Sequence, residues 1–433
     1  MADSSRSANT VGTQVQDWLA QGARHVWRPY CQMKGAPDPL RVASSRGARL
    51  VLDDGRELVD GIASWWTACH GYNHPYIQSS VRAQLERLPH VMLGGLAHEP
   101  AYRLATRLAA LLPGELDHVF FAESGSVAVE IAMKMALQYW VNRGEPNRRR
   151  FVSFLGAYHG DTLATMTLCD PQEGMHALFA GVMPAQHVVA LPRSPADESA
   201  LEALLESERG AIAAIVVEPG VQGAGGMLMH DAELLRKLRR LADRHDLLLI
   251  FDEIFTGFGR TGPLFVCRGS GVTPDIITLS KALTGGTLPL SAAVANRRVF
   301  EAFWSDDPGA ALMHGPTYMG NPLACAAANA SLDLFETGTW QADVARIEVG
   351  LREGLMPCRE LPGVLDVRVR GAIGVVEFAR PVDAAALSAR FAERGVFIRP
   401  MGRVVYLTPA FVITDDELAQ LTAAIRSVLA SPG

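Results

Sequence analysis

The sequence lacks the features that mark several classes of protein. It has no uninterrupted apolar stretch long enough to cross a bilayer, and its polar start, MADSSRSANTVGTQ, lacks the apolar core of a secretion signal. No block of lysine and arginine stands out, and the formal net charge is −6. Nucleic acid and anionic membrane surfaces are therefore disfavoured as main partners. We expect the first residues to form a short disordered tail.

Cysteine is also scarce, and the spacing of the cysteines is not typical of a metal site. There is no C-x-x-C pair and no ligand-like spacing to histidine among the six cysteines, which are Cys31, Cys69, Cys169, Cys267, Cys325 and Cys358. This argues against a zinc site and against a disulfide framework. We expect no metal and a reducing, cytoplasmic location.

What is present is typical of a large globular chain. The 433 residues are 48% apolar and 20% charged, enough for one large core and a smaller one. From about residue 76, short apolar runs alternate with segments of helical periodicity. This alternation predicts the α/β class, with a mainly parallel sheet covered by helices on both faces.

The pattern changes near both ends of the chain. Asp54-Gly55 lies between two apolar runs and predicts a hairpin, and after about residue 335 two runs resemble adjacent antiparallel strands. Thr414 to Glu417 reads as a capping box that starts the last helix. We predict three parts: an N-terminal segment, 1–62, that belongs to the small domain; a large domain, 63–335; and a C-terminal small α+β domain, 336–433.

Chemically useful side chains follow five of the predicted strands. In a parallel sheet, ligands bind at the carboxyl ends of the strands. The residues at these ends are Gly125-Ser126, Tyr158-His159-Gly160, Glu218, Asp252-Glu253 and Ser280-Lys281. Chance could place any one of them there, but five together predict a site.

Lys281 is the most informative of these residues. It follows an apolar strand, and the sequence is otherwise uncharged from 276 to 294. A solvated lysine at a strand end is the alternative interpretation. A desolvated lysine has a lowered pKa and can form a Schiff base with a carbonyl, which points to an aldehyde cofactor.

Three further strand ends fit such a cofactor. Asp252 could keep a pyridinium nitrogen protonated, or it could only cap the next turn. Gly125 and Ser126 begin a long helix whose free N–H groups would bind a phosphate, although many helices begin in this way. Tyr158 could stack on a ring, or it could be an ordinary core tyrosine.

Together, these residues lie in a set of motifs that resembles a known family. The motifs are FDEIFTGFGRTG, TLSKALTGG, SGSVAVEIAMKMA, AYHGDTLATM, EPGVQGAGGM and HGPTYMGNPLACAAA. In this order they are similar to those of the subgroup III pyridoxal-phosphate aminotransferases of fold type I, from about residue 25 to the C-terminus. The resemblance implies that the large domain binds pyridoxal 5'-phosphate. It also implies a homodimer with shared active sites.

The resemblance assigns roles to the cofactor residues. It implies that Lys281 forms the Schiff base and later moves a proton, that Asp252 pairs with the pyridinium nitrogen, and that Tyr158 stacks on the ring. These three are the expected catalytic residues. The phosphate end is expected to be held by Gly125, Ser126, Pro316 and Thr317, of which the threonine comes from the partner subunit.

The resemblance also assigns a substrate side. Arg399 is expected to pair with a substrate carboxylate, and Arg260, with Asp161 nearby, to help place the amino donor. Glu253 is expected to make structural hydrogen bonds. The full set of expected substrate residues is Tyr30, Trp65, Trp66, Asp161, Arg260, Gly315, Arg399 and Tyr406.

Local segments narrow the resemblance to one branch of the family. HVWRPYCQM, GIASWWTACHGYNHP, KMALQYW and IRPMGRVVYLTPAFVI are similar to segments of the biotin-pathway branch. This implies transfer of an amino group from S-adenosylmethionine to 8-amino-7-oxononanoate. Lysine as donor remains an alternative, as does an ω-amino acid or diamine aminotransferase. A racemase, a decarboxylase or a ligand-binding protein on the same fold are further alternatives.

Three residues depart from the family pattern. Phe255 stands where alanine is common, Cys31 where serine or threonine is usual, and Met401 where phenylalanine is common. Phe255 is close in sequence to Asp252 and could reshape the donor side. These departures bear on donor identity more than on the type of reaction.

Overall fold

The computed structural model describes residues 17–171, 177–179 and 181–431. The expected disordered tail, MADSSRSANTVGTQ, lies outside these residues. In the described part of the chain, no helix is both long enough and apolar enough to cross a membrane. The cytoplasmic location stays a prediction.

The first described elements include three strands of a small sheet. They are α1 (Trp18–Gly22), β1 (Val42–Arg46), β2 (Arg49–Leu52), β3 (Glu57–Asp60) and α2 (Ala63–Trp66). The predicted hairpin is confirmed, since β2 and β3 are antiparallel and Gly55 has the positive φ of +85° that its tight turn requires. The sheet order is β1-β2-β3-β15. Its last strand, from near the C-terminus, pairs in parallel with β3 through Val396 and Val59.

A seven-stranded sheet with the order β4-β12-β11-β10-β7-β5-β6 forms the centre of the molecule. The pairs among β11, β10, β7, β5 and β6 are parallel, so the predicted mainly parallel sheet is confirmed. One strand was not predicted: β12 runs antiparallel to both of its neighbours. The strands are β4 (Leu116–Ala122), β5 (Arg150–Phe154), β6 (His187–Val189), β7 (Ile212–Val217), β10 (Leu248–Asp252), β11 (Ile276–Leu279) and β12 (Ser291–Asn296).

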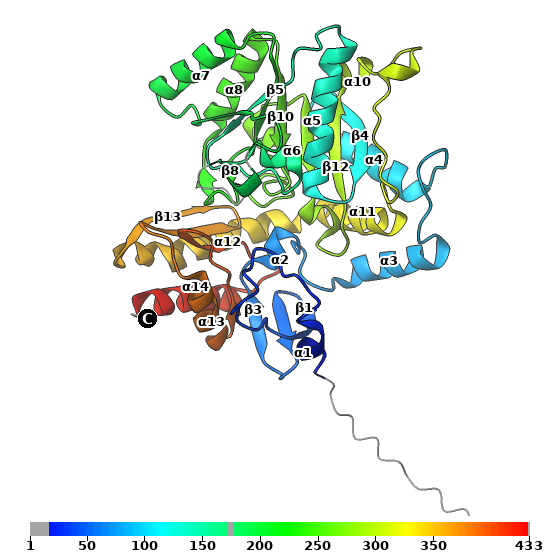
Figure 1. Ribbon diagram of the computed structural model, residues 1–433. Helices are drawn as coiled ribbons and strands as arrows, with labels where there is room; N and C mark the ends of the chain where they lie inside the picture. Colours follow the sequence, from blue (N-terminus) through cyan, green and yellow to red (C-terminus); the bar gives the residue numbers. More distant parts are fainter. Residues whose placement is uncertain (1–16, 172–176, 180, 432–433) are drawn as a thin grey trace, which may run out of the picture.

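Helices cover both faces of this sheet (Figure 1). In β10, Leu248 and Ile250 pack into the apolar cluster under α5, while Leu249 and Phe251 pack into the cluster on the other face. The helices of this region are α3 (Pro75–Arg87), α4 (Glu99–Leu111), α5 (Gly125–Asn142), α6 (Leu163–Met166), α7 (Pro195–Ser207), α8 (Ala232–Arg244), α9 (Val266–Ser270), α10 (Arg297–Glu301) and α11 (Pro322–Glu336). The short elements are β8 (Val221–Gln222), β9 (Leu228–Met229) and the 3-10 turns η1 (Ala177–Phe179), η2 (Lys281–Thr284) and η3 (Pro308–Ala310).

The C-terminal part lies below the large sheet in Figure 1. Its predicted antiparallel pair is confirmed by β13 and β14, and β16 completes a three-stranded sheet. The capping box is also confirmed, because Thr414 and Glu417 bond each other's backbone at the start of α14. The elements are α12 (Thr339–Leu355), η4 (Met356–Glu360), β13 (Val364–Arg370), β14 (Ile373–Phe378), α13 (Ala384–Glu393), β15 (Val396–Phe397), β16 (Val404–Leu407) and α14 (Asp415–Ala430).

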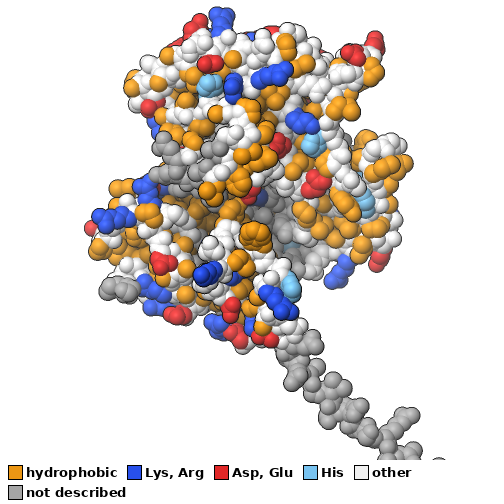
Figure 2. All heavy atoms as spheres, in the orientation of Figure 1, with side chains coloured by type: hydrophobic (Ala, Val, Ile, Leu, Met, Phe, Trp, Pro, Cys, Tyr) orange, Lys and Arg blue, Asp and Glu red, His pale blue; other side chains and the backbone are white. Residues whose placement is uncertain are grey.

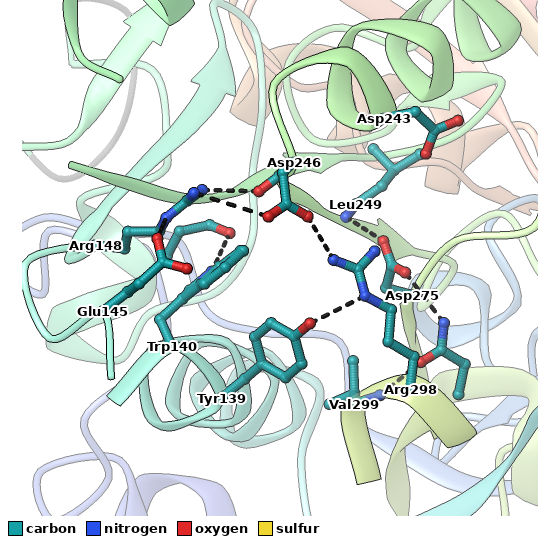
Figure 3. Close-up of polar contacts among 12 residues, drawn as sticks. Tyr139, Trp140, Glu145, Arg148, Asp243, Asp246, Leu249, Asp275, Arg298 and Val299 are labelled. Atoms are coloured by element: carbon teal, nitrogen blue, oxygen red, sulfur yellow. Dashed lines mark hydrogen bonds and ion pairs between the residues drawn. The ribbon is translucent and has the colours of Figure 1, made fainter. Parts of the chain in front are cut away.

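Ion pairs and hydrogen bonds stabilise the end of the large sheet at which β10 begins (Figure 3). Asp246, just before β10, accepts a hydrogen bond of 2.7 Å from Arg298 of α10 through its carboxylate and another of 2.7 Å from Arg148 through its carbonyl. Arg298 also donates to the hydroxyl of Tyr139 on α5 at 3.0 Å. These contacts fix α5 against the sheet and leave the carboxyl ends of the strands free for a site. The domain limits at residues 62 and 335 stay predictions.

Candidate active site

The carboxyl ends of the parallel strands surround a cavity of about 110 Å³. The molecular surface is hollowed between the upper and lower parts of the molecule (Figure 2). Six of the expected site residues line the cavity: Trp66, Gly125, Ser126, Tyr158, Asp252 and Lys281. Lys281 and Gly125 also border an adjoining, larger cavity of about 410 Å³. The strand-end rule therefore brings the expected cofactor residues to one place.

Lys281 begins η2 directly after β11. Its backbone has a φ of +48°, a left-handed conformation that is costly for a lysine and recurs at functional sites. Burial lowers the pKa of its amine, although the charges of Asp252, Glu218 and Asp161 oppose that shift. The ammonium nitrogen lies 5.2 Å from the centre of the Trp66 ring. A buried amine with a lowered pKa is suited to nucleophilic attack on a carbonyl and to proton transfer.

Asp252 ends β10 and is held in a fixed orientation. Its Oδ2 lies 2.8 Å from Nδ1 of His159, and its Oδ1 accepts hydrogen bonds from the Thr278 hydroxyl at 3.1 Å and from the Ile254 N–H at 3.2 Å. Burial opposes a charge on His159, but its hydrogen bond to Asp252 and the nearby carboxylates raise its pKa. The pair can keep an acid oriented toward a cationic ring nitrogen.

Glu253 follows Asp252 but serves the fold. Its two carboxylate oxygens accept hydrogen bonds of 2.7 Å from the N–H groups of Val266 and Cys267, at the start of α9. Burial raises the pKa of this carboxyl to about 7. The expected structural hydrogen bonds are confirmed, and the paired acids at the end of β10 have separate tasks.

The first turn of α5 forms one end of the cavity. Ser124 caps the helix by accepting a hydrogen bond from the Val127 N–H at 3.3 Å. Ser126 accepts one from the Asp161 N–H at 3.0 Å. The backbone of Gly160 comes so close that a Cβ there would lie 2.4 Å from the Ser126 hydroxyl. This crowded helix start can direct N–H groups at a phosphate.

Aromatic residues form two walls near the cavity. On one wall the Tyr30 ring stands edge-on to Trp65, with 6.2 Å between the ring centres, and the Arg399 guanidinium lies 5.1 Å from the centre of the Trp65 ring. On the other wall Trp66 packs against Phe255, with 4.3 Å between the ring centres. Tyr406 adjoins Trp66 at 6.3 Å, completing this second wall.

Asp161 connects the two tyrosines at the mouth of the site. Its carboxylate accepts a hydrogen bond of 2.8 Å from the Tyr158 hydroxyl and another from the Tyr30 hydroxyl. The two hydroxyls themselves lie 3.3 Å apart. Burial and these neighbours raise the pKa of Tyr158, so its hydroxyl keeps its proton.

Apart from Asp161 and the residues of the two aromatic walls, four expected residues do not line the cavity. Arg260 is buried, donates to the carbonyls of Ala372 at 3.2 Å and Pro409 at 2.7 Å, and stacks on the Phe411 ring. The expected proximity of Arg260 and Asp161 stays a prediction. The other three, in the connection between α10 and α11, are Gly315, Pro316 and Thr317.

Sequence reasoning assigns no role to His159 and Glu218, two titratable residues that line the cavity. His159 was noted only as a neighbour of Tyr158, although a histidine beside a strand-end tyrosine was a usable signal. Glu218 follows β7 and accepts hydrogen bonds from the N–H groups of Tyr158 at 3.0 Å and Gly223 at 2.8 Å. Burial raises the pKa of Glu218 to about 7.

Comparison with known proteins identifies the family. The class-III aminotransferase model matches residues 31–429. The chain is 46% identical to adenosylmethionine-8-amino-7-oxononanoate aminotransferase of Mycobacterium leprae, over 98% of this chain and 99% of that one. It is 43% identical to the protein of the same name from Corynebacterium glutamicum, over 94% of this chain and 97% of the relative.

Two solved structures have the same fold. An adenosylmethionine-8-amino-7-oxononanoate aminotransferase from Methanocaldococcus jannaschii superposes with a TM-score of 0.90, at 30% identity over 95% of this chain and 98% of that one. A PLP-bound amine transaminase from an uncultivated Pseudomonas species gives 0.86, at 33% identity over 94% and 98%. The predicted fold class is confirmed, and the chain belongs to the class-III aminotransferase family.

Proposed function

We propose that this enzyme transfers an amino group from S-adenosylmethionine to 8-amino-7-oxononanoate, using pyridoxal phosphate, and so makes 7,8-diaminononanoate for biotin synthesis. The relatives from Mycobacterium leprae and Corynebacterium glutamicum carry the name of this activity over nearly their whole length. The observation that carries the proposal is the wall of Tyr30, Trp65 and Arg399. An apolar wall with one cation suits a long methylene chain that ends in a carboxylate.

The cavity fits pyridoxal phosphate. The helix start at Gly125 and Ser126 would suit the phosphate, the buried acid Asp252 would suit the ring nitrogen, and Tyr158, which lines the cavity, would stack on the ring. Lys281 would hold the cofactor through its amine. When bound, the cofactor supplies a ring that withdraws electrons from the carbon bearing the amino group.

The side chains of this protein then divide the work. Lys281 Nζ, with its lowered pKa, would take a proton from the donor carbon in one half-reaction and deliver a proton to the acceptor carbon in the other. Asp252, oriented by His159, would keep the ring nitrogen protonated. Trp66 and Phe255 close one side of the cavity and keep water from the reacting atoms.

The acceptor and donor sides are assigned to different residues. Arg399 pairs with the carboxylate of 8-amino-7-oxononanoate beside Trp65. The role of Arg260 on the donor side is indirect in this proposal. Its hydrogen bond to the Pro409 carbonyl supports the segment that follows Tyr406, which adjoins Trp66.

A homodimer with shared sites is part of the proposal. Gly315 to Thr317 lie outside the cavity of their own chain, and exposed apolar side chains flank them, including Met313 and Tyr318. The partner subunit's Thr317 would reach the cavity beside Gly125 and complete the phosphate site, while Gly315 would line the substrate channel. The large domain, residues 63–335, would bind the cofactor.

A cofactor absorbance titration tests the proposed activity. Purified enzyme is offered S-adenosylmethionine, lysine and 4-aminobutyrate separately, and the spectrum is followed. We expect only S-adenosylmethionine to convert the pyridoxal form to the pyridoxamine form, and 8-amino-7-oxononanoate to reverse the change. Conversion by another amine alone would leave the family intact and overturn the proposed donor.

A further inference from the structure

Helix α5 carries three polar side chains that face the connection between α10 and α11. They are Lys134, Gln138 and Asn142, spaced four residues apart, so they share one face of the helix. All three donate to this connection, chiefly to its backbone carbonyls. We name these three side chains the donor ladder.

Lys134 forms the rung nearest the active site. Its ammonium donates to the Met313 carbonyl at 2.8 Å and lies 3.1 Å from Nδ1 of His314. An ammonium has no acceptor, so this ring nitrogen accepts and the imidazole is neutral. Burial and the charge of Lys134 both lower the pKa of His314, which keeps the ring in that form.

Gln138 and Asn142 form the other two rungs. Gln138 donates to the carbonyls of Ala310 at 3.1 Å and Ala311 at 2.9 Å. Asn142 donates to the carbonyls of Ala302 at 3.1 Å and Ala310 at 3.0 Å. Side-chain amides on one helix thus satisfy carbonyls at both ends of residues 302–311, a segment that has little regular structure.

The ladder holds the segment that leads directly to Thr317. Among the described residues, the backbone N–H groups of 308–319 that bond backbone carbonyls reach only carbonyls of residues 307–316. In the same part of the chain, the hydrogen bonds that other elements give to residues 308–314 come from α5. Met313 and Thr317 are exposed, so packing within the chain does little to fix them.

We propose that Lys134, Gln138 and Asn142 are positioning residues, which hold residues 310–314 so that Thr317 is aimed at the phosphate site of the partner subunit. The proposal rests on the shared-site homodimer proposed above. Helix α5 then serves two sites: its first turn, at Gly125, binds the phosphate in its own subunit, and its middle places the phosphate ligand of the other.

Cofactor affinity of the apoenzyme tests this proposal without any amino donor or acceptor. Pyridoxal phosphate is titrated into Thr317→Ala, Lys134→Met and the double variant. We expect Thr317→Ala and Lys134→Met each to weaken binding about tenfold, as for a lost hydrogen bond to a charged group. If Lys134 acts through Thr317, the double variant binds no more weakly than Thr317→Ala, and Lys134→Arg restores most of the affinity.

Trp140→Phe is the matched control for general damage to α5. Trp140 lies on the sheet side of the helix, and its indole N–H donates to the Ala213 carbonyl at 2.9 Å (Figure 3). The variant also loses a bond from side chain to carbonyl, but away from the ladder. We expect it to lower thermal stability and to leave cofactor affinity within about twofold. An equal loss of affinity in Trp140→Phe and Lys134→Met would overturn the proposal.

Mixed dimers show which subunit the ladder serves. A dimer of one Lys281→Ala subunit and one Lys134→Met subunit has a single lysine-linked cofactor, whose phosphate ligand comes from the subunit with an intact ladder. We expect that cofactor to titrate with wild-type affinity. The weaker affinity of the Lys134→Met homodimer would show that the ladder acts within its own subunit and would overturn the proposal. If Thr317→Ala binds normally, the shared site is wrong instead.

Discussion

Asp60 holds the backbone of Ser64 in a turn that ordinary residues avoid. Its carboxylate accepts hydrogen bonds from the N–H groups of Ile62 at 2.8 Å and Ser64 at 3.1 Å, and from the Tyr72 hydroxyl. All four residues of 63–66 have positive φ values, from +46° to +75°. Such backbone is costly for residues other than glycine, so the buried acid stabilises the turn that presents both tryptophans to the site.

Asp60→Asn tests this relationship. The amide keeps the size of the acid but has one acceptor oxygen for three donors, so we expect the free energy of unfolding to fall by about 2 kcal/mol. The KM for 8-amino-7-oxononanoate should rise, because Trp65 loses its fixed position. Denaturant unfolding and steady-state kinetics measure both. Asp54→Asn, in the exposed hairpin turn, is the control, and similar losses in the two variants would contradict the role of Asp60.

Lys281→Ala should abolish turnover and leave a folded protein. In the proposed mechanism the Lys281 amine holds the cofactor and moves the proton, and alanine can do neither. We expect the variant to retain cofactor noncovalently through the α5 helix start and Asp252. Absorbance after dialysis and circular dichroism check these outcomes. Turnover near the wild-type rate would reject Lys281 as the catalytic amine.

Arg399→Ala should weaken the keto substrate far more than the amino donor. The lost ion pair lies beside the half-exposed Trp65, so we expect the KM for 8-amino-7-oxononanoate to rise about tenfold or more, with a smaller change for S-adenosylmethionine. Arg399→Lys keeps the charge without the planar guanidinium and should recover part of the loss. Equal changes for both substrates would contradict the assignment.

The sequence was sufficient to group the residues at the carboxyl ends of the parallel strands, and the reason is physical. Strand ends in a parallel sheet converge, so the order of apolar runs along the chain was enough to group Tyr158, Asp252 and Lys281. The contact between His159 and Asp252 was missed, because the two residues are 93 positions apart, follow different strands and share no spacing pattern.

Other features could not be predicted because they depend on long-range packing. The antiparallel strand β12 is largely apolar, as the parallel strands of the sheet are, and composition does not reveal its direction, which its connections set. Arg260 looks like an exposed loop cation in the sequence. It is buried in the fold, where its Nη1 donates to the carbonyls of Ala372 and Pro409, more than 100 residues away.

Phe255→Ala should widen the cavity beside Trp66. The centre of the Phe255 ring lies 4.3 Å from that of Trp66. The ring also packs closely on Gly223, where an added Cβ would lie 2.7 Å from a ring atom. Removal of the ring therefore leaves a gap that the neighbouring backbone cannot fill. We expect a loss of stability of about 3 kcal/mol and a gain in activity with bulkier amines relative to S-adenosylmethionine. Phe255→Leu controls for the loss of the aromatic ring alone. Unchanged relative rates in both variants would show that Phe255 does not limit the donor.

Glu218 should make the stability of the cofactor-free protein depend on pH. Burial is the main reason why the pKa of Glu218 rises from 4.5 to about 7, because a charged carboxylate is costly to bury. The unfolded chain therefore releases this proton at lower pH than the native protein does. The stabilising effect is complete below pH 4.5 and is lost as the pH rises through 7.

The difference between wild type and Glu218→Gln isolates that effect. From pH 5 to pH 8, we expect the free energy of unfolding of the wild type to fall relative to the variant by on the order of 3 kcal/mol, because only the wild type must bury a carboxylate at high pH. Urea unfolding of the apoenzyme at four pH values measures this. Glu86→Gln, on the exposed surface of α3, controls for the loss of one charge. A difference that stays constant with pH would mean that Glu218 is ionised at no cost, with its charge balanced by His159 and Lys281.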